Sequence, residues 1–441
     1  MQRLIPSETA LVLGGGGAKG AYEIGVIDAL EELGIRAGSV YGVSIGALNA
    51  AMYAQERTGE ARALWDSLTV SDIVSEEDAA LAEEAETMFD RADKLLEFIT
   101  RNAHHKGLDT TPMERILERF VSEDALRASS IRFGLVATRF PSLTMVQKRL
   151  EDMEPGSVHS WLMASAACYP AFPMRAIGNE RYIDGGFCDN TPVDMAVRAG
   201  ARHVIAVDIG KHPSHTQYAA RPNITYIRTT HPLGGLLTFN PERSRRNRVL
   251  GYNDAMRAFG KLRGTLYAFD PIDALSLGSR AQDFVVRLTQ FEAGLRLQNA
   301  LDRKGGAPLF ALLEEGLRPG ADAIDYFLRA CELCAAALEV EPAQVLTFEA
   351  LRGELRARLP LEKAESMLDS LLGGRIGVLF APPQPDRKLI LACLYHLLQR
   401  ESGFSPLAMH TLSAFPRELL CALTLREVLC RCCQVKGALV H

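Results

Sequence analysis

Residues 40–51 have the sequence VYGVSIGALNAA. The apolar start predicts a short β-strand, the segment from Gly42 to Gly46 predicts a tight turn, and the alanine-rich end predicts a helix beginning near Ala47. The pattern Gly-x-Ser-x-Gly is typical of a nucleophile elbow, a strained strand-to-helix turn with Ser44 at its tip. Glycine on both sides lets the backbone fold back closely, and the following helix N-terminus favours negative charge. An ordinary glycine turn has the same pattern, so the surrounding sequence must decide.

A second glycine-rich stretch lies upstream, at residues 14–20 (GGGGAKG). It follows the apolar run 10–13 and precedes a helical pattern that ends at Gly34. Consecutive glycines leave backbone N–H groups uncovered at a helix start, which makes a cradle for a phosphate or an oxyanion. The glycine spacing fits a dinucleotide loop, but residues 39–42, about 20 positions further on, hold no carboxylate for a ribose. The Gly-Lys-Ser/Thr ending of a P-loop is also absent.

One helix and one strand separate the glycine loop from Ser44, so a right-handed crossover should bring both to the same edge of a parallel sheet. Asp184 stands at the end of the strand pattern 182–184 and is followed by two glycines. Further strands are predicted at residues 131–138, 204–208 and 224–227. The fold class that follows is α/β, a mostly parallel sheet sandwiched by helices.

These motifs together resemble the patatin-like phospholipase family, in its bacterial form. That family has a glycine-rich oxyanion loop, a Gly-x-Ser-x-Gly nucleophile and an Asp-Gly-Gly or Asp-Gly-Ala base, in the order found here. The resemblance covers roughly residues 8–265 and is highly specific, because three short motifs in one order are rare by chance. The similar residues at other positions are Ser165, Pro170, Asn190 and Pro192.

The resemblance implies a serine acyl hydrolase of the phospholipase A or lysophospholipase type, with Ser44 as nucleophile and Asp184 as base in a dyad without histidine. It implies an oxyanion hole at Gly15, Gly16 and Gly17. The motif-supporting residues are Ala18, Lys19, Gly20, Gly42, Gly46, Gly185 and Gly186. Lys19 either raises the local positive potential or is simply solvated.

Two other interpretations stay open. An α/β-hydrolase with a Ser-Asp-His triad would draw its base from the histidines after Asp184, which are His203, His212, His215 and His231. Against it, the glycine loop follows the first strand and lacks the histidine of an HGGG-type motif. The second alternative is a non-catalytic lipid-binding scaffold that keeps the fold.

The other segments are predicted to be helical. Residues 56–130 form an excursion flanking the site, either a lid or a fixed helix pair. His104–His105 within it have no acidic or cysteine partner at a spacing suited to a metal site.

After residue 268 the resemblance fades, and leucine-rich helical patterns occupy 306–317, 323–339, 344–358, 361–373, 386–401 and 414–433, broken at Gly373–Gly374 and Pro382–Pro383. We therefore expect a catalytic domain at 1–268 and an all-helical domain of unknown role at 269–441. Cys331 and Cys334 are expected to be core thiols, while Cys430, Cys432 and Cys433 could bind a metal or be acylated.

Composition narrows the function classes. The 441 residues carry a net charge of −5, which argues against a nucleic-acid partner, and 47% hydrophobic with 23% charged residues is typical of a soluble globular protein. No apolar run reaches the ~18 residues that span a bilayer, and the first residues lack a signal-peptide pattern. Nine cysteines fit reduced thiols. We expect a cytoplasmic protein, with signal-less export open, and neither cofactor nor metal.

The expected partner is a phospholipid or another acyl-ester lipid. One basic concentration, at residues 243–263, could dock on an anionic lipid surface or be a solvated helix face, so peripheral membrane contact stays open. The sequence does not fix the oligomeric state, the lipid head group or the acyl position.

Overall fold

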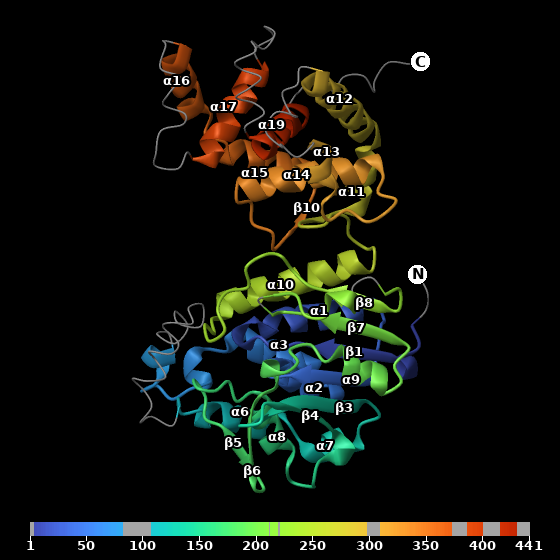
Figure 1. Ribbon diagram of the computed structural model, residues 1–441, viewed down its shortest axis with the longest axis vertical. Helices are drawn as coiled ribbons and strands as arrows, with labels where there is room; N and C mark the ends of the chain where they lie inside the picture. Colours follow the sequence, from blue (N-terminus) through green and yellow to red (C-terminus); the bar gives the residue numbers. More distant parts are fainter. Residues whose placement is uncertain are drawn as a thin grey trace. The chain divides into compact units, whose positions relative to one another are not determined.

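The computed structural model describes residues 4–82, 107–210, 212–218, 221–297, 309–372, 386–399 and 415–429. The chain divides into two compact units, residues 1–259 and 260–441 (Figure 1). Several sequence predictions lie outside the described residues: His104–His105, the breaks at Gly373–Gly374 and Pro382–Pro383, and Cys430, Cys432 and Cys433. The functional boundary at residue 268 stays a prediction.

The first unit is built on an eight-stranded mixed sheet in the order β5-β6-β3-β2-β1-β7-β8, with β4 paired to β3. Strands β3, β2, β1, β7 and β8 are mutually parallel, and β4, β5 and β6 join through antiparallel pairs. The strands are β1 Thr9–Leu13, β2 Ser39–Val43, β3 Arg132–Phe140, β4 Thr144–Arg149, β5 Arg175–Ile177, β6 Glu180–Asp184, β7 His203–Val207 and β8 Ile224–Ile227. This arrangement confirms the predicted fold class.

The central strands are continuous apolar runs because both faces of the sheet are covered. All five residues of β1 and all five of β2 are buried. The two strands pair in parallel with Leu13 opposite Gly42, which confirms the predicted crossover. Strands β4 and β5 were not predicted from the sequence.

Helices cover both faces of this sheet. They are α1 Ala21–Glu32, α2 Ile45–Ala54, α3 Thr58–Ser67, α6 Thr111–Phe120, α7 Glu123–Ala128, α8 Val158–Ser165, α9 Val193–Arg198 and α10 Pro241–Ala258, with short 3-10 turns at η1 Pro6–Glu8, η2 Gly17–Gly20, η3 Val70–Asp72, η4 Leu150–Asp152, η5 Gly185–Phe187 and η6 Thr216–Tyr218.

The chain moves across the sheet from β1 to β2 to β3 in one direction and reaches β7 in the other. Right-handed connections therefore place α1 and α2 on one face and α9 on the opposite face. Helix α9 packs on β1, β2 and β7 there.

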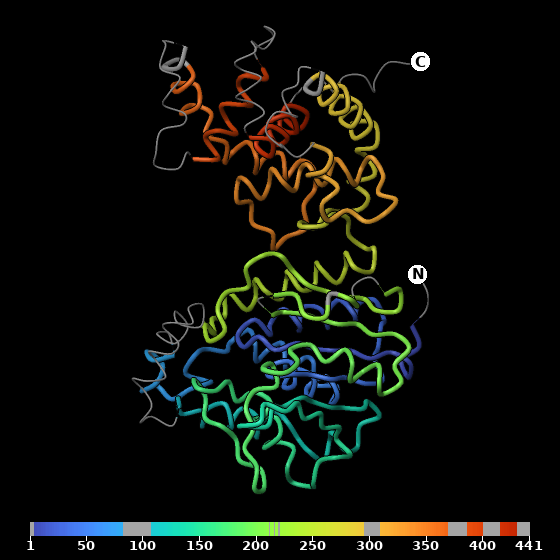
Figure 2. Tube along the Cα trace, viewed as in Figure 1, coloured from blue at the N-terminus to red at the C-terminus, as the bar shows by residue number. Residues whose placement is uncertain are grey.

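Helices α1 and α10 lie side by side along their lengths (Figure 2). Two glycines allow this approach: a Cβ on Gly25 would lie 1.8 Å from the Arg248 carbonyl oxygen, and one on Gly251 would lie 1.9 Å from that of Tyr22. This contact fixes α1, and with it the glycine loop that leads into α1.

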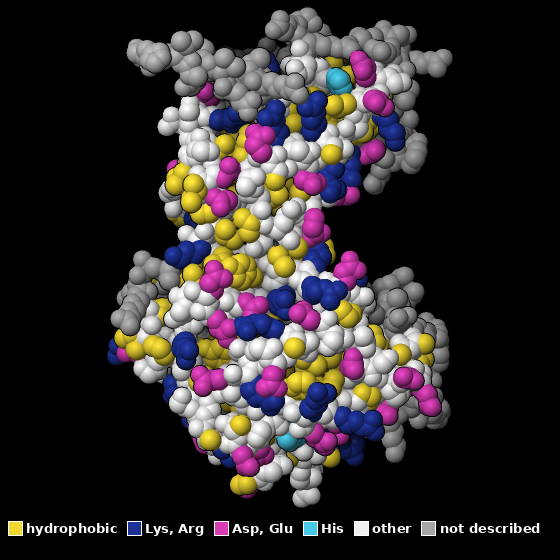
Figure 3. Space-filling model, turned by 180° about the vertical axis from the view of Figure 1, so that it is seen from behind, with side chains coloured by type: hydrophobic (Ala, Val, Ile, Leu, Met, Phe, Trp, Pro, Cys, Tyr) yellow, Lys and Arg dark blue, Asp and Glu magenta, His cyan; other side chains and the backbone are white. Residues whose placement is uncertain are grey.

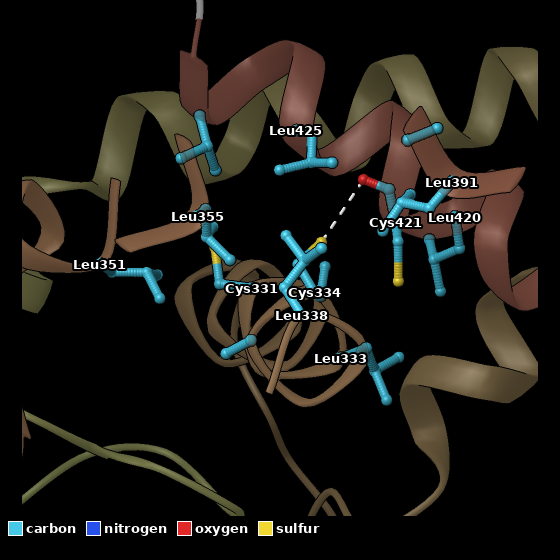
Figure 4. Packing of buried hydrophobic residues seen from close by; sticks show 14 of the residues in the cluster. Cys331, Leu333, Cys334, Leu338, Leu351, Leu355, Leu391, Leu420, Cys421 and Leu425 are labelled. Atoms are coloured by element: carbon cyan, nitrogen blue, oxygen red, sulfur yellow. Dashed lines mark hydrogen bonds between the residues drawn. The ribbon is translucent and has the colours of Figure 1, made fainter. Parts of the chain in front are cut away.

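The second unit is helical, as predicted. Its helices are α11 Pro271–Ser276, α12 Gly278–Leu297, α13 Leu309–Glu314, α14 Ala323–Ala337, α15 Phe348–Arg358, α16 Leu361–Leu372, α17 Arg387–Gln399 and α19 Pro416–Leu429, and a two-stranded sheet pairs β9 Ala268–Phe269 with β10 Val345–Leu346. Cys331 and Cys334 on α14 are fully buried among leucines, and the Cys334 thiol donates to the Cys421 carbonyl at 3.4 Å (Figure 4). Burial raises the pKa of both thiols, so they are core residues, as expected.

Candidate active site

The edge of β3 brings Ser44 and Asp184 together. Residues 134–136 of β3 pair with β2 and β4, and residues 137–139 pair with β4 and β6. A strand has two edges and β4 occupies one of them throughout, so β2 and β6 share the other. Parallel β2 ends with Val43 opposite Val136, and antiparallel β6 ends with Asp184 opposite Ala137. The two strands thus run toward each other and end beside adjacent residues of β3.

Ser44 occupies the predicted elbow between β2 and α2. Its backbone has φ 55° and ψ −128°, the left-handed side of conformational space that a non-glycine residue rarely adopts. Close packing requires glycine at Gly46, where a Cβ would lie 2.5 Å from the Leu13 carbonyl oxygen and 2.6 Å from that of Gly14. The elbow is therefore pressed against the end of β1.

The buried Ser165 hydroxyl links the elbow to β3. The Ser44 N–H donates to Ser165 Oγ at 2.9 Å, and the Ser165 hydroxyl donates to the Val136 carbonyl at 2.7 Å. Ser165 is 0% exposed. The sequence pointed to Ser165 only through the family resemblance, and this bridge between the elbow and β3 was not predicted.

The Asp184 carboxylate accepts a hydrogen bond from the Gly186 N–H at 2.7 Å. Only 7% of Asp184 is exposed. Burial raises its pKa from the usual value to about 6, although the Ser44 hydroxyl and the Gly186 N–H both stabilise the charged form and oppose the shift. Gly185 leaves the space for this turn, since a Cβ there would lie 2.2 Å from the Val136 carbonyl oxygen.

The glycine loop lies beside the serine, as the crossover predicts. A Cβ on Gly15 would lie 3.3 Å from Cβ of Ser44 and 2.5 Å from Oδ1 of Asn190. Asn190 holds the loop twice: its carbonyl accepts the Gly15 N–H at 3.0 Å, and its Nδ2 donates to the Gly15 carbonyl at 2.9 Å. Within the described ranges the N–H groups of Gly16 and Gly17 donate to no other residue.

The remainder of the loop is fixed by neighbouring backbone. The Gly14 N–H donates to the Val207 carbonyl at 3.0 Å and the Ala18 N–H to the Leu236 carbonyl at 2.8 Å, while the Lys19 N–H closes the 3-10 turn. Gly17 has φ +56°. The loop therefore sits in the crevice between β1 and β7, where the direction of the chain across the sheet reverses and open α/β folds place their ligands.

A buried carboxyl near this loop was missed by the sequence analysis. Glu23 on α1 is 0% exposed, and its Oε2 accepts from Asn49 Nδ2 at 2.8 Å. The same Nδ2 donates to the Gly20 carbonyl, and Trp65 Nε1 donates to Asn49 Oδ1 at 3.0 Å. Burial raises the pKa of Glu23 well above its usual range. A lone acid on the apolar face of α1, next to the glycine loop, is the sequence signal for it.

Three of the four histidines proposed for a triad occupy other positions. His203 begins β7 opposite Thr9, at the end of the sheet away from Ser44. His215 Nε2 donates to the Asp189 carboxylate at 2.8 Å. His212 is exposed. The Asp184 carboxylate is paired with a hydroxyl and an amide instead of an imidazole.

Three arginines of the basic stretch 243–263 are paired with carboxylates. Arg248 contacts Asp66 at 2.8 Å, Arg257 pairs with Asp254, and Arg263 pairs with Asp322 at 3.1 Å. On the face shown in Figure 3, Lys and Arg alternate with Asp and Glu. Local ion pairs therefore neutralise part of this stretch.

Two features are absent from the described ranges. No cluster of three His, Cys, Asp or Glu side chains there is placed to hold a metal ion. Of the helices that the structure describes, none is both long and apolar enough to traverse a bilayer.

Residues 11–197 match the family described as "Patatin-like phospholipase". Relatives include human "Patatin-like phospholipase domain-containing protein 6", 29% identical over 48% of this chain and 14% of that protein. "Lysophospholipase NTE1" of Coccidioides immitis is 25% identical over 71% of this chain and 19% of that protein. The chain thus spans about a fifth or less of the length of these relatives.

Among solved structures, VipD from Legionella pneumophila has a TM-score of 0.37 at 14% identity, covering 96% of this chain and 90% of VipD. ExoU of Pseudomonas aeruginosa, in complex with SpcU, has a TM-score of 0.33 at 18% identity, covering 93% of this chain and 88% of that one.

Replacing Asp184 by Asn should stabilise the protein at neutral pH. Between the ordinary Asp pKa and about 6, the folded protein binds more protons than the unfolded chain, so Asp184 lowers the free energy of unfolding as pH rises through that window. Asn has nearly the same side-chain shape as Asp but does not ionise, so the variant avoids this loss of stability. Chemical denaturation should show Asp184→Asn more stable than wild type by on the order of 2–3 kcal/mol at pH 7.5, and by much less at pH 4.5. A variant equally destabilised at both pH values would contradict the burial argument.

Proposed function

We propose that the chain is a lipid acyl hydrolase of the phospholipase A or lysophospholipase type, acting through a Ser44–Asp184 dyad. The observation that supports it is the placement of Ser44 and the buried Asp184 at the ends of β2 and β6, next to adjacent residues of β3, where the Ser44 hydroxyl lowers the pKa of the Asp184 carboxyl. The elbow lies within the residues that match the patatin-like phospholipase family. A serine next to a base is the arrangement that activates a weak nucleophile.

In the first step Asp184 takes the proton of Ser44 as Oγ attacks the ester carbonyl. The tetrahedral intermediate then collapses, the carbon–oxygen bond to the alcohol breaks, and Asp184 returns the proton to the departing alcohol. Water enters, gives a proton to Asp184 and attacks the acyl-serine, which releases the fatty acid and reprotonates Ser44. A base whose pKa is about 6 is mostly ionised at neutral pH and still basic enough to accept the proton.

The oxyanion hole belongs to the glycine loop. Because the Gly15 N–H is already bonded to Asn190, Gly15 shapes the loop. The donors are the N–H groups of Gly16 and Gly17, which have no acceptor among the described residues. One such donor lowers the barrier by about 3 kcal/mol. The N-terminus of α2 adds its positive end beside the same oxygen.

Contact with a lipid surface would come from the rim of this site. Strand β3 extends four residues past its pairing with β2, so the β3–β4 turn overhangs the edge that carries Ser44. Leu143 and Met145 of that hairpin are exposed, as is Phe187, three residues after Asp184. The Cys188 thiol donates to the Leu143 carbonyl at 3.2 Å, which joins the two segments. Exposed apolar side chains at one rim suit an interface with lipid.

The dyad predicts that Asp184→Asn and Ser44→Ala lose activity to a similar extent, at least about a thousandfold in kcat, and that the double variant is no worse than either, because the two residues act as one unit. A fluorophosphonate should label wild type at Ser44, give no adduct with Ser44→Ala, and react much more slowly with Asp184→Asn. Hydrolysis of a soluble ester and intact-mass spectrometry provide the measurements.

Histidine variants are the matched control. His203→Ala, His212→Ala, His215→Ala and His231→Ala should each stay within about tenfold of wild type, a loss of about 1.4 kcal/mol. A folded histidine variant that falls a thousandfold would favour the triad instead. A folded wild type that takes no label and cleaves no ester would favour the non-catalytic scaffold.

If the rim contacts lipid, changes at the rim should lower the rate of hydrolysis of aggregated substrates and leave the rate on soluble substrates unchanged. The double variant Leu143→Ser/Met145→Ser should hydrolyse phospholipid vesicles about tenfold more slowly, since each lost side chain removes on the order of 1 kcal/mol of apolar burial, while its rate on a monomeric ester stays near wild type. Ile272→Ser/Leu275→Ser, at two even more exposed positions on α11, is the control and should keep vesicle hydrolysis. Equal losses in both double variants would contradict a specific rim contact.

A further inference from the structure

The Asn190 side chain lies between the glycine loop and the turn that follows Asp184. Its Nδ2 donates to the Gly15 carbonyl at 2.9 Å, and this bond fixes the orientation of the amide, because only the nitrogen can donate to a carbonyl. The other amide atom, the oxygen Oδ1, is close to both segments. A Cβ added to Gly15 would lie 2.5 Å from Oδ1, and a Cβ added to Gly186 would lie 2.8 Å from it.

Asn190 Oδ1 is available as a hydrogen-bond acceptor. Among the residues that the structure describes, none donates a hydrogen bond to it. Asn190 is half-buried, and Oδ1 does not belong to the buried side-chain atoms that lack a partner, so solvent reaches it. An amide oxygen accepts up to two hydrogen bonds. The backbone and Nδ2 of Asn190 therefore hold the loop, while Oδ1 can bind a water molecule.

The spacing between Asn190 Oδ1 and the Asp184 carboxylate is that of two oxygens bridged by one water. A Cβ on Gly186 would lie 2.8 Å from Asn190 Oδ1 and 3.1 Å from Asp184 Oδ1, and both are hydrogen-bond lengths. Gly186 occupies that side, but the points at these two distances form a ring around the line that joins the oxygens. A water elsewhere on the ring would donate to both oxygens. The nucleophile is also near, since a Cβ on Gly15, close to Oδ1, would lie 3.3 Å from Cβ of Ser44.

We propose that Asn190 Oδ1 and Asp184 together hold the water that hydrolyses the acyl-enzyme. The proposal rests on the proposed function, in which Ser44 becomes acylated. Acylated Ser44 has no hydroxyl hydrogen, so the Asp184 carboxylate can accept one from water instead. Both hydrogens of the water are then bonded, one to Asp184 and the other to Asn190, and a lone pair of its oxygen is directed at the acyl carbon.

The deacylation step balances without a further reactant. The O–H bond that faces Asp184 breaks, its proton moves to the carboxylate, and a carbon–oxygen bond forms at the acyl carbon. The tetrahedral intermediate then collapses by cleavage of its bond to Ser44 Oγ, which takes the proton back from Asp184. Fatty acid and free enzyme result. Asn190 exchanges no proton, and its Oδ1 acts only in this half of the reaction, because water takes no part in acylation.

The two roles of Asn190 have different kinetic consequences. The contact with Gly15 shapes the loop that we propose as the oxyanion hole, which both acylation and deacylation use. Loss of that contact should therefore slow both steps by a similar factor. Loss of Oδ1 should slow deacylation alone, so acyl-Ser44 should accumulate.

The test uses the full chain with p-nitrophenyl butyrate. The first release of p-nitrophenolate gives the acylation rate constant, and intact-mass spectrometry after an acid quench gives the fraction of acyl-enzyme. Asn190→Ala removes Oδ1 together with the contact to Gly15, and Asn190→Leu does so at nearly the same side-chain volume. In both variants the deacylation rate constant should fall by about tenfold or more relative to the acylation rate constant, as expected for one hydrogen bond to a reacting group.

Two control variants separate the water contact from the clamp. Asn190→Asp keeps an oxygen in place of Oδ1 and replaces only the Nδ2 donor, so both steps should slow together and acyl-enzyme should not accumulate. Asn223→Ala is the matched control outside the site, because Asn223 Nδ2 donates to the Arg202 carbonyl at 3.1 Å, just before β7. It should keep both rate constants.

Two outcomes would overturn the assignment of Asn190 Oδ1. The first is a wild-type ratio of the two rate constants in folded Asn190→Ala and Asn190→Leu, which would leave the clamp as the only role of the side chain. The second is accumulation of acyl-enzyme in Asn190→Asp, which differs from wild type at one atom and so tests the proposal even where the larger changes disturb the loop. Failure of the proposed function is distinguishable, because then wild type releases no p-nitrophenolate and gains no acyl group.

Discussion

The structure depends on one edge of β3 that serves two strands. Val136 pairs with the end of β2 and Ala137 with the end of β6, so two chain segments 140 residues apart terminate next to each other. Backbone pairing therefore delivers Ser44 and Asp184 to one point, without a long side chain bridging the gap. The Ser165 hydroxyl, bonded to both the elbow and Val136, closes this junction.

Two residues of this junction adopt states that are unfavourable by themselves. Ser44 holds a left-handed backbone conformation, and burial keeps the Asp184 carboxylate in a setting that disfavours its charge. Strain and desolvation of this kind gather at functional sites and persist when the surrounding structure over-determines them. Here the glycine contact between α1 and α10 and the Asn190 clamp on the glycine loop are the surrounding structure. The same rigidity leaves Gly16 and Gly17 as the proposed donors, because Gly15 is used to hold the loop.

Local sequence patterns were sufficient for the parallel core, the elbow and the strand that ends at Asp184, since each has a continuous apolar run followed by glycines. They also predicted that the glycine loop and Ser44 share an edge, because crossover handedness is nearly invariant. The short strands β4 and β5 were missed because neither has a buried apolar run: their residues are exposed or half-buried, although each strand forms a hairpin with its neighbour in sequence. The Ser165 bridge, the Asn190 clamp and the buried Glu23 were missed for another reason: each is a tertiary hydrogen bond that no local pattern encodes.

The central claim is the direct contact between Ser44 and Asp184, and a titration of the Asp184 carboxyl by ¹³C NMR tests it most directly. The resonance can be assigned by its absence in Asp184→Asn. We predict a pKa of about 6 in wild type and a higher pKa in Ser44→Ala, because the hydroxyl that stabilises the carboxylate is then missing. An ordinary Asp pKa near ~3.9, or the same value with and without the Ser44 hydroxyl, would contradict the account.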